Sequence, residues 1–406
     1  MLQRRPRVRS VRVKSLFSPE MSLFAVILYL VEFGRGAALI SFIPIYGKNA
    51  LGLNLDVIGL AVAAHYLTDT VVKLAIGYLM NRLSVRTIVV GALLLSMAGM
   101  LLMGFTPVPW IFIAASGLFG IGISPIWIVC LTRVRENRRG TQMGVLYTIW
   151  LVGLGSGPAV TNFTLEIGAE LTFWIMAAVS AAALLLSLFI PREVHAEMDY
   201  VPFRRQLAML GDRLKEMNLL LPGMVLQTLA AGMLVPILPS FAEDYLGLSH
   251  PQYSLLLLIG GGCTAAGLIP MGRLSDNLGK KWFLVTGFCL FGLALCALTG
   301  ISTLGLSFAW ALVLGVAYAA VLPAWNALLA AYVPPGQQGL GWGVFSTVEG
   351  IGGLIGPGIG GILAEAFGEP SVVRFAGFIF IAISLMYMIF PFRTFRGEGA
   401  AGDTAR

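Results

Sequence analysis

Charged residues are scarce in this chain of 406 residues. Asp, Glu, Lys and Arg together make up 12% of the sequence, hydrophobic residues make up 57%, and the mean hydropathy is +0.85. A soluble globular domain usually carries about 25% charged residues. The shortage of charge therefore excludes a soluble domain and predicts that most of the chain lies in lipid.

Cysteine and the sequence motifs of catalysis are also rare or missing. The four cysteines, Cys130, Cys263, Cys289 and Cys296, lie singly in apolar segments, without the spacing of metal ligands or of a disulfide framework. The aqueous segments contain no nucleophile elbow, metal cluster or phosphate-binding loop. We therefore expect no enzymatic activity and no cofactor.

Long apolar windows are abundant instead. A helix needs about 20 mostly apolar residues to cross a bilayer, and this condition is met twelve times, at 22–45, 54–79, 86–105, 109–131, 140–163, 168–190, 218–242, 251–275, 282–301, 305–333, 339–365 and 371–392. Gly and Pro inside these windows are tolerated because neighbouring helices satisfy the freed backbone groups. The pattern predicts a polytopic membrane protein.

The basic residues show a consistent bias between the connections. They gather in the N-terminal tail and near 82–86, 133–139 and 273–281, whereas acidic residues gather near 166–170, 243–244 and 365–369. Cytoplasmic loops keep an excess of Lys and Arg. We therefore expect a multi-pass protein of the cell membrane with both termini in the cytoplasm. The net charge of +7 then reflects topology and contact with anionic membrane lipids, not a nucleic-acid partner.

The two halves of the chain repeat each other. An offset of 195 aligns Pro44 with Pro239 and the Leu-Gly-Leu run at 51–53 with that at 246–248, and an offset of 199 aligns the Gly-Pro pairs at 157 and 356. The repeat predicts two six-helix bundles, an N-terminal one at 21–190 and a C-terminal one at 218–392. The apolar residues at steps of four and three between 203 and 217 predict an amphipathic cytoplasmic linker at 191–217. The charge and polarity of the ends predict a basic cytoplasmic tail at 1–20 and a cytoplasmic tail at 393–406.

The segment 272–281 resembles the cytoplasmic loop signature of the major facilitator superfamily. The resemblance implies an all-α membrane protein with twelve helices in two pseudo-symmetric bundles. It also implies conformational roles for Gly77, Arg82, Arg86, Gly272, Asp276, Lys280 and Lys281. In the first half, Asn81 replaces the Asp and Ser84 the Gly of the pattern. The Gly-Pro pairs are typical of the exchangers of this superfamily, but small residues also permit plain close packing.

The ionisable residues inside the apolar windows do not repeat. Glu32 and Arg35 share a face of the first window, and His65, Asp69 and Lys73 step by four along the second. A charge at mid-bilayer costs at least about 2.5–3.5 kcal/mol on insertion scales, so such residues indicate a site by default. We interpret them as a polar cavity with Asp69 as the first choice for proton coupling, Glu32 as an alternative and His65 as a relay. The alternative is a pair of structural ion pairs, with His65 as a packing residue.

Two tryptophans lie in the middle of their windows, Trp127 and Trp150. An indole can stack on a sugar ring and donate a hydrogen bond, or it can simply fill the core. The second half offers few polar side chains, among which Gln227, Asn326 and Glu349 are secondary candidates. A cavity that is polar on one side and apolar on the other fits an amphiphile.

Further blocks are similar to the lipoteichoic-acid glycolipid flippases of Gram-positive bacteria, the LtaA family. They are VEFGRG at 31–36, His65 with Asp69, SPIW at 124–127, RGTQMG at 139–144, LVPILP at 234–239 and LPAWN at 322–326. The resemblance implies a proton-coupled antiporter that moves a diglucosyl-diacylglycerol anchor to the outer leaflet, with lipoteichoic-acid synthesis enzymes as partners. It places Glu32, Arg35, Asp69, Trp127 and Trp150 in the headgroup pocket, to which we add Lys73.

Two other functions compete with this one. A proton-coupled multidrug exporter would share the fold, but Arg35 and Lys73 would repel its cationic substrates. A membrane sensor or scaffold would normally add a soluble domain, for which the chain has no room.

Overall fold

The computed structural model describes residues 19–80, 82–132, 139–191, 215, 217–300, 303–332 and 338–391. Helices dominate these residues, and no strand occurs among them. The expected linker at 191–217 lies outside the described residues except for Pro191, Lys215 and Met217. Both expected tails lie almost wholly outside them, as does Asn81.

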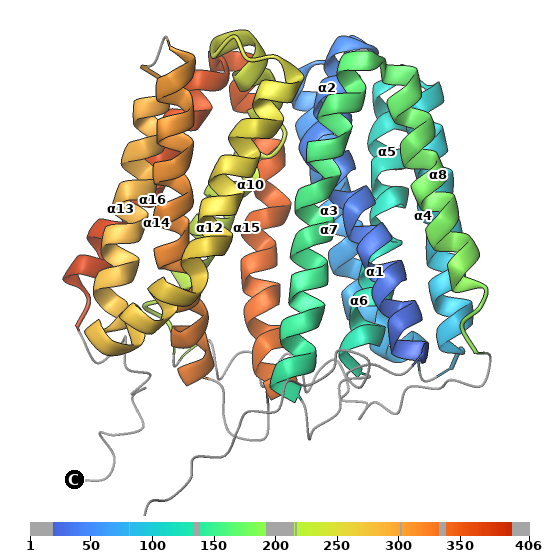
Figure 1. Ribbon diagram of the computed structural model, residues 1–406, viewed down its shortest axis with the longest axis horizontal. Coiled ribbons are helices and arrows are strands. Elements are labelled where there is room, and N and C mark those ends of the chain that lie inside the picture. The colour runs from blue at the N-terminus through green and yellow to red at the C-terminus, as the bar shows by residue number, and fades with distance from the viewer. Residues whose placement is uncertain are drawn as a thin grey trace, which may run out of the picture.

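The helices form two groups that lie side by side (Figure 1). The first group consists of α1 (Pro19–Ala37), η2 (Ala38–Phe42), α2 (Ile43–Asn49), α3 (Leu55–Met80), α4 (Val85–Phe105), α5 (Pro109–Gly120), α6 (Ile123–Thr132), α7 (Arg139–Ile167) and α8 (Ala169–Ser187). The second consists of α10 (Leu221–Leu234), α11 (Leu238–Ser240), η4 (Phe241–Tyr245), α12 (His250–Leu278), α13 (Lys280–Leu298), α14 (Leu304–Ala331), α15 (Gln338–Phe367) and α16 (Glu369–Ile389).

The number of spans agrees with the sequence. Ten of the described helices, counting the continuous run 19–49 and the pair α5–α6 as one each, are long and apolar enough to cross a bilayer, and the bent pair Leu221–Leu234 and Leu238–Tyr245 makes an eleventh. The twelfth expected span is α7, a helix of 29 residues. Its Gly, Ser, Thr and Asn residues lower its hydropathy, but its length is sufficient to cross.

The repeat is visible in the backbone. Gly52 and Gly247, which are 195 positions apart, both adopt a left-handed conformation, with φ of 65° and 66°. Each directly follows the first span of its half, where a residue with a Cβ atom would be strained. The two halves therefore share a loop geometry as well as a sequence pattern.

The first spans of the two halves differ in continuity. Helix α1 runs through the π-helical turn η2 into α2, so the span extends from Pro19 to Asn49 and exceeds the expected 22–45. The corresponding span in the second half bends by 53° between α10 and α11. Pro236 lies in this break and cannot donate a helical hydrogen bond, which explains the interruption.

The Gly-Pro helices pack closely against the first span of their own half. A Cβ atom on Gly157 of α7 would lie 2.3 Å from the carbonyl oxygen of Phe33, and one on Gly356 of α15 would lie 2.5 Å from that of Leu229. Such contacts require glycine, because any side chain would separate the two backbones. Close packing alone therefore accounts for these glycines, whether or not the helices also bend.

We expect Gly157→Ala to destabilise the protein, because the added methyl group overlaps the α1 backbone. Overpacking of this kind costs about 1–3 kcal/mol, and the thermal unfolding midpoint in detergent should fall. The matched control is Gly155→Ala on the same helix, where a Cβ atom has no neighbour within 4 Å. An equal unfolding midpoint for the two variants would show that the helices separate without cost.

The two halves meet at one end of the molecule, called here the upper end, which carries the loops at 50–54, 106–108 and 246–249. Lys48 forms ion pairs with Asp244 and, at 3.8 Å, with Glu369. Asn49 donates to Glu243 at 3.1 Å, and the backbone N–H of Leu55 donates to Glu365 at 3.2 Å.

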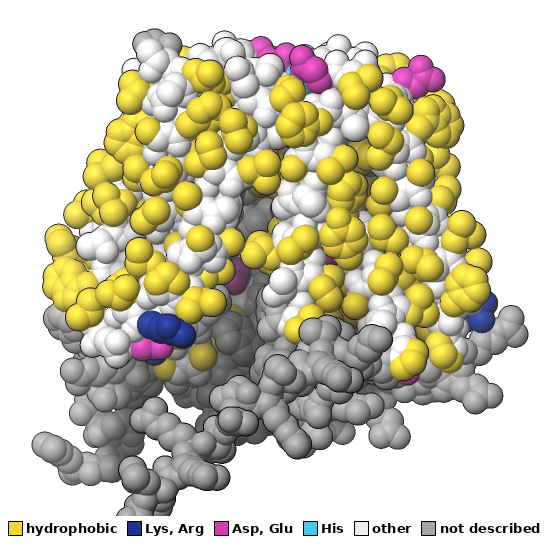
Figure 2. Space-filling model, in the orientation of Figure 1, with side chains coloured by type: hydrophobic (Ala, Val, Ile, Leu, Met, Phe, Trp, Pro, Cys, Tyr) yellow, Lys and Arg dark blue, Asp and Glu magenta, His cyan; other side chains and the backbone are white. Residues whose placement is uncertain are grey.

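Packing adds to this contact between the halves. A Cβ atom on Gly59 of α3 would lie 2.4 Å from the carbonyl oxygen of Pro357 in α15, and Ser254 of α12 donates to the carbonyl oxygen of Ala159 in α7 at 3.2 Å. Figure 2 shows acidic side chains along the upper edge, apolar side chains over the sides and a hollow between the halves below.

Candidate functional site

The first polar cluster joins α1 to α7. Glu32 is 1% exposed, and its Oε2 lies 2.7 Å from Nη2 of Arg35, one turn further along α1. The Arg35 guanidinium lies over the Trp150 ring of α7, with Cζ 5.9 Å from the ring centroid. A cation on an indole face is stabilised by the ring quadrupole, so the three side chains form one unit. The sequence predicted the pairing of Glu32 with Arg35, but it did not predict the stacking on Trp150. The shared polar cavity stays a prediction.

The second polar cluster joins α3 to α6. Asp69 is 3% exposed, and its Oδ2 lies 2.6 Å from Nζ of Lys73. Ser124 donates its hydroxyl proton to Oδ1 of Asp69 and also contacts the Asp69 carbonyl oxygen at 3.0 Å. The Lys73 side chain is 45% exposed and therefore lies at the surface of the protein. Asp69 is thus a buried carboxylate whose counter-ion reaches that surface.

His65 lies one turn above Asp69 on α3 and is fully buried. Its ring packs against Phe119, with centroids 5.6 Å apart, and makes an edge contact with Tyr66. No side-chain hydrogen bond joins it to Asp69 among the described residues. The packing alternative for His65 agrees with this geometry, and the relay stays a prediction.

The other tryptophan, Trp127 on α6, packs against a buried apolar cluster of the first half that includes Ile126 and Val129. Its repeat partner Trp325 is 3% exposed and stacks on Tyr387, with ring centroids 6.2 Å apart. Both tryptophans thus contribute to core packing. A role of Trp127 in sugar binding stays a prediction.

The second half contains a cavity of about 370 Å³. Its wall is mainly apolar and aromatic, and it is lined by Gln227, Thr228, Ala231, Gly260, Thr264, Phe288, Phe291, Leu314, Gly315, Tyr318, Val321, Leu322, Trp325, Asn326, Glu349 and Phe380. Its size falls within the roughly 300–1,000 Å³ of ligand pockets. All three secondary candidates from the sequence, Gln227, Asn326 and Glu349, lie in this wall.

Glu349 of α15 is the carboxylate of this cavity. Its Oε1 accepts hydrogen bonds from Nε1 of Trp325 at 2.8 Å and from Nε2 of Gln227 at 3.3 Å. None of the ion pairs in the described part of the chain includes Glu349. Glu349 differs in this respect from Glu32 and Asp69, each of which has its own cation.

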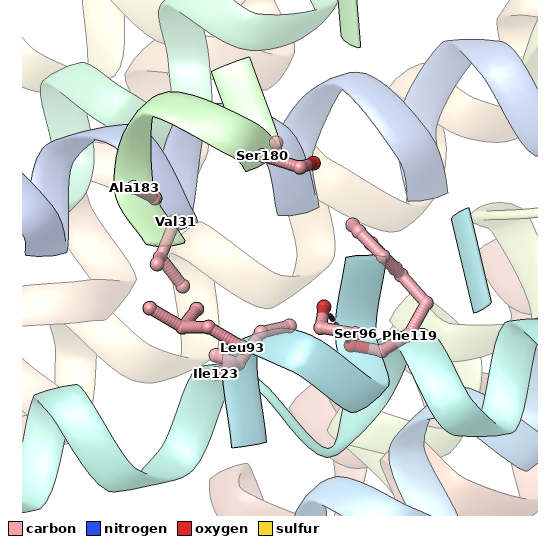
Figure 3. A pocket seen from close by; sticks show the side chains of 8 residues that line it. Val31, Leu93, Ser96, Phe119, Ile123, Ser180 and Ala183 are labelled. Carbon is pink, nitrogen blue, oxygen red and sulfur yellow. Dashed lines mark hydrogen bonds between the residues drawn. The ribbon is translucent and has the colours of Figure 1, made fainter. Parts of the chain in front are cut away.

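A smaller cavity of about 20 Å³ lies within the first half (Figure 3). Val31, Leu93, Phe119, Ile123 and Ala183 line it, and Ser96 donates to the carbonyl oxygen of Phe119 at 2.7 Å. About 10–15 Å³ is needed to hold one water molecule. This cavity therefore has room for about one water molecule and is too small for a substrate.

The residues expected to act in conformational change lie at the lower end, opposite the contact between the halves. Lys280 donates to the carbonyl oxygen of Ala327 at 2.9 Å and Lys281 to that of Phe390 at 2.6 Å. Asp276 is exposed, and none of the described ion pairs includes it. Gly272 packs near Pro323. Gly77 lies in α3, Arg82 is exposed just after that helix, and Arg86 lies in the first turn of α4.

Comparison with protein families matches the Major Facilitator Superfamily at residues 24–215 and 220–404, which is nearly the whole chain. The chain belongs to this superfamily. Its two bundles are therefore the two halves of a major facilitator transporter, as the sequence predicted. The comparison also supports a multi-pass membrane location.

Within the superfamily, the chain is similar to curated proteins named proton-coupled antiporter flippase LtaA. It is 30% identical to the protein of Staphylococcus saprophyticus over 91% of this chain and 93% of the relative, and 30% identical to that of Staphylococcus haemolyticus over 94% and 96%. These figures confirm the predicted resemblance to the LtaA family. The relatives are transporters rather than enzymes.

Solved structures support the fold. Two structures of the nucleoside transporter NupG, one of them a single-substitution mutant, have TM-scores of 0.75 and 0.78 against this chain and cover 91% of it. Their sequence identity is 14%, so the likeness concerns the major facilitator fold alone.

Sequence reasoning missed several residues of the site. Ser124 appeared only within the SPIW block, yet it holds Asp69 by two contacts. The upper-end pairs of Lys48 with Asp244 and Glu369 were also missed, since their partners are about 200 and 320 positions away in the chain. No signal of spacing could have found these contacts, because they depend on how the halves dock.

Proposed function

We propose that this protein is a proton-coupled antiporter of the flippase type that carries a glycolipid, a diglucosyl-diacylglycerol that anchors lipoteichoic acid, from the inner to the outer leaflet. The upper end then faces outward and the lower end, with both termini, faces the cytoplasm of a Gram-positive bacterium. Lipoteichoic-acid synthesis enzymes would act on the same lipid.

The observation that carries the proposal is the division of the interior between the halves. The first half presents Glu32, Arg35, Asp69 and Lys73 together with Trp150, whereas the second half presents a cavity with mainly apolar walls. An amphiphile with a hydroxyl-rich headgroup and acyl chains fits such a division. The names of the LtaA relatives agree with it.

The residue roles follow from this division. Glu32, Arg35, Lys73 and Trp150 bind the headgroup hydroxyls, with Trp127 at the edge of that pocket. Asp69 exchanges the proton, because its carboxylate can be stabilised either by Lys73 and Ser124 or by binding a proton, with no movement of the backbone. Glu32 and His65 are the alternative carriers.

The arrangement of the halves supports alternating access. The ion pairs between the halves in the described residues lie at the upper end, and Lys280 and Lys281 of the lower-end signature are bonded within the second half. This is the pattern expected when the path is closed on the outside. Rocking of the halves about the central site would reverse it.

The test is leaflet translocation of a fluorescent diglucosyl-diacylglycerol in proteoliposomes, with and without an imposed pH gradient. The proposal predicts movement of the glycolipid that the gradient accelerates. A fluorescent phosphatidylcholine is the matched lipid control, and a cationic dye tests the alternative of a multidrug exporter. Dye transport with an immobile glycolipid would assign the protein to that alternative.

A further inference from the structure

The cavity of the second half carries a feature that acyl chains do not need. Its aromatic rings, which include Phe288, Phe291, Tyr318 and Phe380, come from α13, α14 and α16. Phe291 packs against Tyr318 at 6.0 Å and against Phe380 at 4.9 Å between ring centroids. Within this aromatic wall, Glu349 presents a carboxylate that is hydrogen-bonded to Trp325 and Gln227.

The geometry at Glu349 leaves one oxygen for a ligand. Both described hydrogen bonds, from Trp325 and from Gln227, end on Oε1, whereas Oε2 accepts none from the described residues. The titratable side chains that face Glu349 from neighbouring helices are Tyr318 of α14 and Tyr387 of α16. Among the described residues, the site therefore holds a carboxylate and no basic side chain beside it.

The repeat makes this asymmetry plain. In the first half, the carboxylate Glu32 is matched by Arg35 and Trp150. In the second half, Gln227 occupies the position of Glu32, Ala230 that of Arg35 and Glu349 that of Trp150. The carboxylate therefore lies on the first helix in the first half and on the fifth helix in the second half, and the second half has no basic residue at the position of Arg35.

We propose that this cavity binds lipophilic organic monocations, with the positive centre on the Glu349 carboxylate and the apolar body against the aromatic rings. A desolvated cation gains from the charge and from the faces of several aromatic rings at once. The sequence predicted that Arg35 and Lys73 would repel a cation, but in the structure each forms an ion pair with its own carboxylate in the first half, which weakens that repulsion. The proposal stands on this cavity and does not depend on the glycolipid.

The probe is tetraphenylphosphonium, measured by equilibrium dialysis against the purified full-length protein in detergent, with empty micelles subtracted. We expect saturable binding that weakens at least tenfold in Glu349→Gln. The matched control is Glu166→Gln, which removes an exposed carboxylate at the end of α7 and should leave binding unchanged. Triphenylphosphine oxide, a neutral compound of similar shape, should bind at least tenfold more weakly to the unmodified protein.

A second variant covers the case in which Glu349→Gln does not fold. Leu314→Trp fills the cavity, keeps the carboxylate and should also abolish binding. Equal affinity for the cation and the neutral compound, or undiminished binding in Glu349→Gln, would overturn the proposal. Glycolipid translocation, measured separately, can succeed or fail without affecting this result, so failure of the two proposals is distinguishable.

Discussion

Replacing Asp69 by Asn is expected to abolish the acceleration of glycolipid transport by a pH gradient. The amide keeps the size of the side chain and can still contact Ser124, but it cannot carry a proton or neutralise Lys73. Folding should survive, because Lys73 is 45% exposed and does not become a buried unpaired charge when its partner is removed. Translocation rates in proteoliposomes with and without the gradient should therefore become equal.

The matched control is Asp56→Asn on the same helix, whose carboxylate accepts from the backbone N–H of Val57 at the upper end, away from the Asp69 cluster. It should retain the response to the gradient. If the pH gradient accelerates transport by Asp69→Asn as much as by the unmodified protein, another carboxylate must carry the proton. Glu32→Gln would then be the next variant.

Arg35→Ala is expected to be the most destabilising of the substitutions in the polar clusters. Glu32 is 1% exposed, so removing its cation leaves a buried charge without compensation. Breaking a buried pair in this way costs about 3–5 kcal/mol, and the indole of Trp150 also loses its cation. The yield of folded protein and its unfolding midpoint in detergent should both fall.

The double variant Glu32→Gln with Arg35→Gln separates stability from function. It removes both charges, so most of the lost stability should return. If Glu32 and Arg35 bind the headgroup, glycolipid translocation stays low in this stable variant. Recovery of translocation together with stability would show that the pair serves only helix packing, which is the structural alternative raised by the sequence.

The fold was largely predictable because its strongest signals are local or periodic. Apolar windows of about 20 residues mark spans in any bilayer, and the repeat relates Gly52 to Gly247 before any coordinate is known. The break at Pro236 was not predicted, since a proline within an apolar window can either bend or end a helix. The first span was predicted as one helix, but its full length was not.

The site was predictable only within single helices. Spacing placed Glu32 with Arg35 and Asp69 with Lys73, because residues three or four apart share a helix face, and both pairs are present. The partners on other helices, Ser124 for Asp69 and Trp150 for Arg35, depend on how α1, α3, α6 and α7 pack.

The sequence by itself determined the membrane location, the number of spans, the repeat and the unequal distribution of charge between the halves. Each of these depends on composition or on periodicity along one chain. The tertiary structure decided that the halves close at the upper end through Lys48. It also decided that Glu349 faces an aromatic cavity in which no described residue supplies a cation. These features arise from contacts between helices distant in sequence, which only the docking of the two bundles can specify.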